Sequence, residues 1–369
     1  MPLELTPLPT NTPNRIELDA VPFAKHDPIL CLLPGMFRVL DEKSRKDINI
    51  PLALAATHGP LTVELSNPYL LNGNDLSVLQ AIVALATSGN TLDPARPELL
   101  TSHEQVLIDN LLAPDSSQGK QQPMREKVLH LQFSVSALLE LIGWPACGEN
   151  RALVQDCLKR LATCVLSIFP TDEPQKIQCF RLISVLSIRG ESARWNRTHA
   201  ALNPRLSEII SDETSRHTRI GLNETRKLGK NQAARILHQR LCAWINEGTT
   251  RPVTYETLVG YLYPTDAEGA ALAAQLAAAH PKLAKQSEKK TKVLQLREMQ
   301  SAMNVLATLP GWSVHLASDA PFVPDPIMTD YEQSRAEQKH NKSCSAARRA
   351  AAIDVMKTVI HVRRGRCSY

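Results

Sequence analysis

The chain has 369 residues, of which 43% are hydrophobic and 21% are charged, so it is long enough to bury a sizeable core in about two domains. Its apolar runs are too short to cross a bilayer, and its Pro-rich, polar start does not resemble a signal peptide. We therefore expect a cytoplasmic protein with no membrane partner. Aromatic residues make up only 4%, which argues against a surface that binds single strands by base stacking.

The formal net charge of +5 is concentrated at the C-terminus. Residues Tyr331–Tyr369 hold nine Lys and Arg against three Asp and Glu, a net charge of +6, and the rest of the chain carries −1. A basic tail on a near-neutral body is typical of a protein that binds a polyanion such as DNA. A tail that is merely solvated is the alternative.

The eight cysteines show no metal-binding pattern. None forms a C-x-x-C pair, and several lie among apolar neighbours. This distribution predicts buried thiols in a reducing cytosol, without a metal site or a disulfide framework.

The first half of the chain alternates predicted helices and strands. After a flexible segment at residues 1–25, Asp75–Ala86 has the apolar spacing of an amphipathic helix. Val128–Phe133 alternates like a strand, and Ser134 can cap a short helix that ends at Gly143. Arg151–Leu161 is a third predicted helix.

Two β-branched segments follow, Cys164–Phe169 and Ile177–Ile188, joined by the turn sequence Pro170–Pro174. Helix, strand, turn and strand in this order are typical of the end of a winged-helix unit. Further on, Asn203-Pro204 is expected to start a short helix, and Arg216–Leu222 has the composition of a strand.

The second half repeats this order. Asn223 is expected to cap a long helix that leads into Gln232–Gly248, whose apolar residues fall on one face. Thr254 can cap a short helix that Pro264 ends, and Lys282–Leu309 is a third helix. Near the C-terminus, Ser345–Val362 is expected to form one more helix.

The two halves also share a sequence pattern. Phe133–Trp144 aligns without a gap on Val253–Pro264, with Ser134 opposite Thr254 and Leu138 opposite Leu258. We infer two copies of one helix-turn-helix-like unit, although two short amphipathic helices can also resemble each other by chance.

The predicted fold class is α+β, helix-rich, with two tandem pseudo-symmetric winged-helix domains, a flexible N-terminal tail and a basic C-terminal tail. The expected boundaries are 1–25 for the N-terminal tail, 26–205 for the first domain, 206–328 for the second and 329–369 for the C-terminal tail. A plain helical hairpin in a core is the alternative for each unit.

An ordered series of blocks resembles one protein family. HDPILCLLPGMFRVL (His26–Leu40) resembles the start of the family, and LHQRLCAWIN followed by TLVGYLYP resembles its C-terminal half. Between them lie, in the family's order, GNDLSVLQAIVALA, VQDCLKRL, FRLISV, ALNPRL and TRIGLNETRKL. The series, from about His26 to about Val314, is similar to the RepC replication initiators of IncQ-type plasmids.

This resemblance implies a plasmid replication initiator that binds directly repeated origin sequences (iterons) in double-stranded DNA. It also implies opening of adjacent A·T-rich DNA, so that a plasmid-encoded replicative helicase can load, with a primase as a further candidate partner. Initiators of this type often form homodimers, and the sequence leaves open whether this one does. A sequence-specific transcriptional regulator on the same winged-helix scaffold is the alternative.

The third helix of the second unit is the expected recognition helix, because the major groove admits an α-helix whose exposed residues meet base edges. Lys and Arg neutralise phosphates or read guanine, and Gln can pair with adenine. The candidate DNA-binding residues here are Lys289, Lys290, Thr291, Lys292, Gln295, Arg297 and Ser301. In the first unit, Arg151, Lys159 and Arg160 could contact backbone phosphates. A solvated helix face is the alternative in both units.

No catalytic pattern is complete. The nearest match to a phosphate loop, within Gly221–Asn231, has the wrong spacing and lacks the Ser or Thr that would hold magnesium. Tyr261 and Tyr263 could act as strand-cleaving nucleophiles, but packing is their expected role on a short helix. His238 is expected to be a structural histidine. We therefore expect a protein that is not an enzyme and that needs no cofactor.

Overall fold

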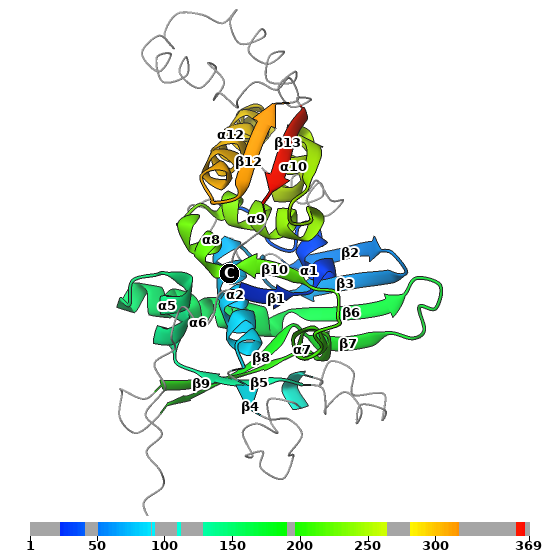
Figure 1. The fold of residues 1–369 in the computed structure, drawn as a ribbon, viewed down its shortest axis with the longest axis vertical. Helices are drawn as coiled ribbons and strands as arrows, with labels where there is room; N and C mark the ends of the chain where they lie inside the picture. Colours follow the sequence, from blue (N-terminus) through cyan, green and yellow to red (C-terminus); the bar gives the residue numbers. More distant parts are fainter. Residues whose placement is uncertain are drawn as a thin grey trace, which may run out of the picture.

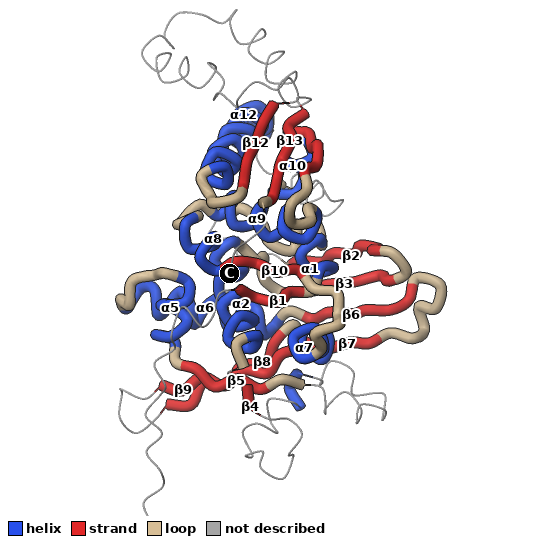
Figure 2. Tube along the Cα trace, viewed as in Figure 1, coloured by secondary structure: helices blue, strands red, loops and turns tan. Residues whose placement is uncertain are grey.

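The computed structural model describes residues 23–40, 51–89, 91–92, 109–111, 128–189, 196–263, 281–316 and 359–365. Residues 1–22 of the predicted flexible start, and all of the predicted basic tail except residues 359–365, lie outside these residues. The predicted boundary at residue 25 was wrong, because Phe23–His26 forms a strand. Figure 2 shows the described helices and strands along the chain. No helix in the described part is both long and apolar enough to cross a membrane.

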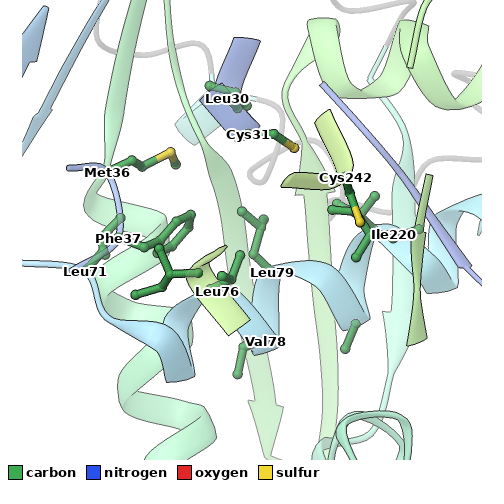
Figure 3. Packing of buried hydrophobic residues seen from close by; sticks show 14 of the residues in the cluster. Leu30, Cys31, Met36, Phe37, Leu71, Leu76, Val78, Leu79, Ile220 and Cys242 are labelled. Atoms are coloured by element: carbon green, nitrogen blue, oxygen red, sulfur yellow. The ribbon is translucent and has the colours of Figure 1, made fainter. Parts of the chain in front are cut away.

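The helix α2 (Gly73–Thr87) lies at the centre of the fold, and every residue from Gly73 to Ala86 is buried. A helix that is apolar or small around most of its circumference is buried on all sides. Its N-terminus has a capping box, in which the Asn72 side chain accepts from the amide of Asp75 and Asp75 accepts from the amide of Asn72. Figure 3 shows Leu76 and Leu79 of α2 near Phe37 in the core.

Elements distant in the sequence cover this helix. The strand β1 (Phe23–His26) pairs antiparallel with β10 (Thr218–Gly221), and both belong to the central region of the molecule in Figure 1. The short helix α1 (Pro28–Leu32) is capped by Asp27 and contacts α9 (Gln232–Trp244), which in turn contacts α2. The hydrophobic core is therefore continuous across the predicted boundary at residues 205 and 206.

Two antiparallel four-stranded sheets flank the centre (Figure 1). The first has the order β2-β3-β6-β7, and its strands are β2 (Leu52–His58), β3 (Leu61–Asn67), β6 (Val165–Pro170) and β7 (Gln178–Arg181). The second has the order β4-β5-β9-β8, and its strands are β4 (Thr91–Leu92), β5 (His130–Phe133), β9 (Asn196–Leu202) and β8 (Ile183–Arg189). The first sheet buries one face, because residues along β3 alternate between buried and exposed from Val63 on.

Two helices of the first half begin at the predicted capping residues, and a third begins earlier than predicted. Ser134 caps α5 (Val135–Ile142), which ends at Gly143 in the left-handed conformation, with φ 80°. The helix α6 (Gly148–Thr163) follows, and Asn203 caps α7 (Pro204–Ser211). The boundaries of α5 and α7 confirm the predictions from capping residues and from Gly, whereas α6 begins before the predicted Arg151 and has no side-chain hydrogen bond at its N-cap Cys147.

The second half contains a unit of helices and one small sheet. The helices α9, α10 (Tyr255–Leu262) and α12 (Pro281–Ala307) contact one another. The strands β11 (Thr250–Thr254), β12 (Trp312–Leu316) and β13 (Val359–Arg364) form an antiparallel sheet in the order β11-β13-β12. Figure 1 places this unit at one end of the molecule. Thr254 caps α10, as predicted.

The prediction that Asn223 caps the long helix was wrong. The chain instead forms a short helix, α8 (Leu222–Lys227), and then turns through Gly229, whose φ is 59°. Asn231 caps α9, since its side chain accepts from the amide of Ala234 at 2.9 Å. The Gly at 229 permits the left-handed turn that separates the two helices.

The prediction that the C-terminal helix continues to Val362, and that this segment belongs to a tail, was also wrong. Val359–Arg364 forms the central strand of the small sheet, paired with β11 and β12. Its buried positions alternate, with Ile360, Val362 and Arg364 facing inward. This alternation of period two, with β-branched residues, is the sequence signal for a strand.

The two units share an element order but differ in sheet topology. Strand, two helices and two strands recur as β5, α5, α6, β6, β7 and as β11, α10, α12, β12, β13. However, β5 pairs with β4 and β9, whereas β6 pairs with β3 and β7. The mixed α and β composition is confirmed, while the strand pairing of the first unit differs from that of the second.

The position of β13 predicts a stability effect that a solvated tail would not produce. Ile360→Ala removes a fully buried side chain and should lower the free energy of unfolding by about 2–5 kcal/mol. The matched control is Val359→Ala at an exposed position of the same strand, which should change it by less than about 0.5 kcal/mol. Urea unfolding followed by circular dichroism measures both, and equal small effects would contradict the placement of β13.

Candidate nucleic-acid interface

The helix α12 carries the predicted apolar stripe on its inner face. Leu296, Met299, Met303 and Leu306 are all buried, which confirms the stripe. Tyr263, the residue directly after α10, donates a hydrogen bond to the Glu298 carboxylate and so connects the two helices at the surface. The packing thus fixes which side of α12 faces solvent.

Three candidate residues of α12 lie on or beside that outer side. Ser301 is exposed, and Gln295 and Arg297 are half-buried. Lys289–Lys292 belong to the helix, but their side chains lie outside the described residues. Leu294 is 54% exposed and occupies a position where a base-reading helix would gain from a polar residue.

The three candidates of α6 have different environments. Arg151 is exposed and lies 3.4 Å from the Ser136 hydroxyl. Lys159 is exposed and forms an ion pair with Asp156 at 3.3 Å. Both side chains can therefore reach a phosphate with little loss of stability, because exposed contacts such as the Lys159–Asp156 ion pair contribute little free energy to folding.

Arg160 was wrongly assigned to the surface. It is only 8% exposed, and its guanidinium lies 2.8 Å from a carboxylate oxygen of Asp75, which is fully buried. The guanidinium also lies close to Cys157. Separating this pair would leave a buried charge unpaired, so Arg160 holds α6 against α2 rather than contacting DNA.

The structure does not bring the two candidate sets together. In Figure 1, α12 lies at one end of the molecule, and α5 and α6 lie on one side of its broader part. A contact that used both sets would have to span the body of the protein.

Sequence reasoning missed a buried polar cluster behind the small sheet. His238 of α9 is fully buried, and its Nε2 lies 2.8 Å from a carboxylate oxygen of Glu224 in α8. The indole N–H of Trp312 in β12 donates to the other carboxylate oxygen at 3.2 Å. Cys242, one helical turn after His238, has its Sγ 3.6 Å from the same Nε2. The cluster therefore joins three elements, and His238 is a structural histidine as predicted.

The side chains of His238 and Glu224 each stabilise the charged form of the other. Burial alone would lower the pKa of His238, but contacts with Cys242 and Glu224 outweigh it and raise the pKa to about 9. Burial alone would raise the pKa of Glu224, but hydrogen bonds from His238 and Trp312 bring it below its usual range. The two side chains therefore form an ion pair at neutral pH.

The same residues have the chemistry of a metal site. Donor atoms of Glu224, His238 and Cys242 lie within 4.8 Å of one another among the described residues, and zinc accepts all three residue types. In this structure, however, the donors bond to one another, and both carboxylate oxygens are occupied. We interpret the cluster as an ion pair that connects α8, α9 and β12.

This ion pair predicts a pH dependence of stability. A histidine whose pKa rises on folding, from 6.5 to about 9, stabilises the fold fully below the lower value and loses this contribution as the pH rises through the higher one. We expect the wild type to lose on the order of 1–3 kcal/mol of unfolding free energy over this range. Urea unfolding at several pH values measures it. His238→Gln should be less stable near neutral pH and show a flatter profile, and equal slopes would contradict the ion pair.

The burial of Arg160 predicts that substitutions at Arg160 and at its neighbour Lys159 change the stability by very different amounts. Arg160→Met should lower the free energy of unfolding by about 3–5 kcal/mol, because it leaves Asp75 buried and unpaired. Lys159→Met, at an exposed position, should change it by less than about 0.5 kcal/mol. Thermal and urea unfolding of the two variants test this prediction. An Arg160→Met protein that is as stable as the wild type but binds DNA more weakly would contradict it and indicate that Arg160 contacts DNA.

Comparisons with known proteins place the chain in a family. Two solved structures of domains 2 and 3 of RctB are similar in part. One covers 92% of this chain and 97% of its own at 9% identity, with a TM-score of 0.45. The other, a selenomethionine derivative, covers 67% of this chain and 81% of its own length at 11% identity, with a TM-score of 0.40.

No curated protein sequence matches the chain. The model of the family described as Replication protein C (RepC) matches residues 18–295, about three quarters of the chain. The chain therefore belongs to the RepC family of replication proteins.

Proposed function

We propose that this protein initiates plasmid replication by binding directly repeated origin sequences and by promoting the opening of the origin. The single observation that carries the proposal is the family match, which extends from residue 18 to residue 295 and so includes the first half of α12. The resemblance of the sequence blocks to initiators of IncQ-type plasmids supports the same role.

We propose that the second unit is a winged-helix domain and that it binds the DNA. Three mutually packed helices, α9, α10 and α12, are accompanied by the antiparallel sheet β11-β13-β12. In such a unit the third helix enters the major groove, and the adjacent strands can follow the phosphate backbone. Here the third helix is α12, whose outer side carries Gln295, Arg297 and Ser301.

The sequence of α12 supports this role. Lys289, Lys290 and Lys292 give its N-terminal half a concentrated positive charge. Cationic side chains that neutralise phosphates release counterions, which supplies much of the affinity for DNA. Gln295 and Ser301 add groups that can read base edges. In the first unit, Arg151 and Lys159 would add phosphate contacts from α6.

The proposed mechanism needs no covalent chemistry. Free energy from many phosphate contacts, and from bending the duplex, can offset a local strand separation of a few kcal/mol. A replicative helicase, with a primase as a further partner, would then load on the opened strand. The protein would act on plasmid DNA in the bacterial cytoplasm, as a monomer or a homodimer.

Substitutions on α12 test the proposed interface. Lys290→Ala and Arg297→Ala should each weaken binding to origin DNA, and each lost phosphate contact should reduce the slope of log Kobs against log salt concentration by about 0.9. Fluorescence anisotropy with a labelled origin fragment measures both quantities.

The matched control is Lys176→Ala in the turn between β6 and β7, where the lysine is 64% exposed and forms a local ion pair with Glu173. This variant should retain wild-type affinity and slope. If the two α12 variants also bind like the wild type, α12 is not the recognition helix.

A further inference from the structure

A cleft of about 400 Å³ lies where the second unit meets the central part of the molecule. It is formed by the segment leading into β10, the C-terminal end of α9, the start of β11 and the end of β13. We call it the arginine cleft and define it by Arg216, Arg219, Trp244, Glu247, Arg251 and Arg364. Its volume falls within the range of small-molecule sites, about 300–1,000 Å³.

The charge of the arginine cleft is strongly positive. Among the described residues, four arginines line it against one carboxylate, that of Glu247. Arg364 forms the base: its guanidinium is nearly fully buried and donates to the carbonyl oxygens of Cys242 and Arg219, both at 2.8 Å. Its ionic contact is with Glu247 at 3.4 Å. Because Arg364 also binds the carbonyl end of α9, it offsets the partial negative charge of that helix end.

The remaining arginines surround the opening. The Arg219 guanidinium lies 4.1 Å from the centre of the Phe23 ring, which holds it in place. Arg251 lies 6.0 Å from the ring of Trp244. Arg216 and Arg251 are exposed, and neither forms an ion pair within the described ranges. The guanidinium groups of Arg216 and Arg251 are thus available to an anion that enters the cleft.

Trp244 gives the cleft an aromatic wall. Its indole is half-buried at the end of α9, next to the charged opening. An aromatic ring beside guanidinium groups suits a ligand that has both a planar base and a phosphate, since bases stack on aromatic side chains and Arg binds phosphate in a bidentate manner.

We propose that the arginine cleft binds a nucleotide, with its phosphate held by Arg216, Arg219 and Arg251 and its base against Trp244. This ligand chemistry has two sources: a free nucleoside phosphate, or one nucleotide of a DNA strand outside the groove contacted by α12. The DNA source rests on the proposed function, whereas the free nucleotide does not.

The experiment compares three full-length proteins. The test variant is Arg216→Gln/Arg251→Gln, which alters two exposed side chains. The control is Lys176→Gln/Lys227→Gln, which removes two exposed positive charges outside the cleft. Circular dichroism and thermal unfolding first establish that all three are folded to the same extent.

The first arm titrates each protein with ATP and measures binding by calorimetry. If the cleft takes a free nucleotide, wild type and control bind, and the test variant binds at least about tenfold more weakly because two charge-assisted contacts are lost. The second arm measures binding of single-stranded and origin double-stranded DNA by anisotropy over a salt series. If the cleft takes a nucleotide of DNA, only the test variant loses slope, by about 0.7 per contact for single strands or about 0.9 for duplex.

A loss in either arm that is confined to the test variant supports the cleft and identifies its source. The inference is overturned if test variant and wild type agree in both arms, if the control loses as much as the test variant, or if the wild type binds neither ligand. Wild-type binding to origin DNA with an unchanged test variant leaves the proposed function intact and overturns only the DNA source. A wild type that binds ATP but not origin DNA would instead contradict the proposed function.

Discussion

The burial of α2 is the constraint on which the rest of the structure depends. Its N-terminus is closed by a capping box in which Asp75 takes part, and the same carboxylate holds Arg160 of α6. Further along, Gln80 donates to the side chain of Gln239 in α9 at 3.1 Å. Gly73 lies so close to Gln232 that a Cβ atom would come within 2.9 Å of it. Hydrogen bonds and an ion pair inside the core thus position α6 and α9 at once, which favours one arrangement over its alternatives.

The second unit is fastened to this centre by buried charges as well as by apolar packing. The pair of His238 and Glu224 connects α9 to α8, and Trp312 adds β12 to the same cluster. Arg364 at the end of β13 reaches the carbonyl oxygens of Cys242 and Arg219. The sheet that accompanies α12 is therefore anchored to the helix that packs on α2.

Local rules predicted much of the fold, and long-range contacts explain what they missed. Ser134 and Thr254 cap their helices as expected, because a cap depends on only a few neighbouring residues. The role of Arg160 was not predictable from its neighbours, since its partner Asp75 lies 85 residues away. The strand Val359–Arg364 carried a readable signal in its alternation, but its partners β11 and β12 lie far back in the chain. Of the candidate site, the inner stripe of α12 was predictable, whereas the buried cluster and the arginine cleft arise only from folding.

DNase footprinting of the full-length protein on its own plasmid, at a salt concentration that suppresses non-specific binding, tests the central claim most directly. The account predicts protection of evenly spaced direct repeats beside an A·T-rich stretch, with permanganate reactivity in that stretch when the protein is bound. Protection of a single palindrome at a promoter, without permanganate reactivity, would contradict it and indicate a transcriptional regulator on the same scaffold.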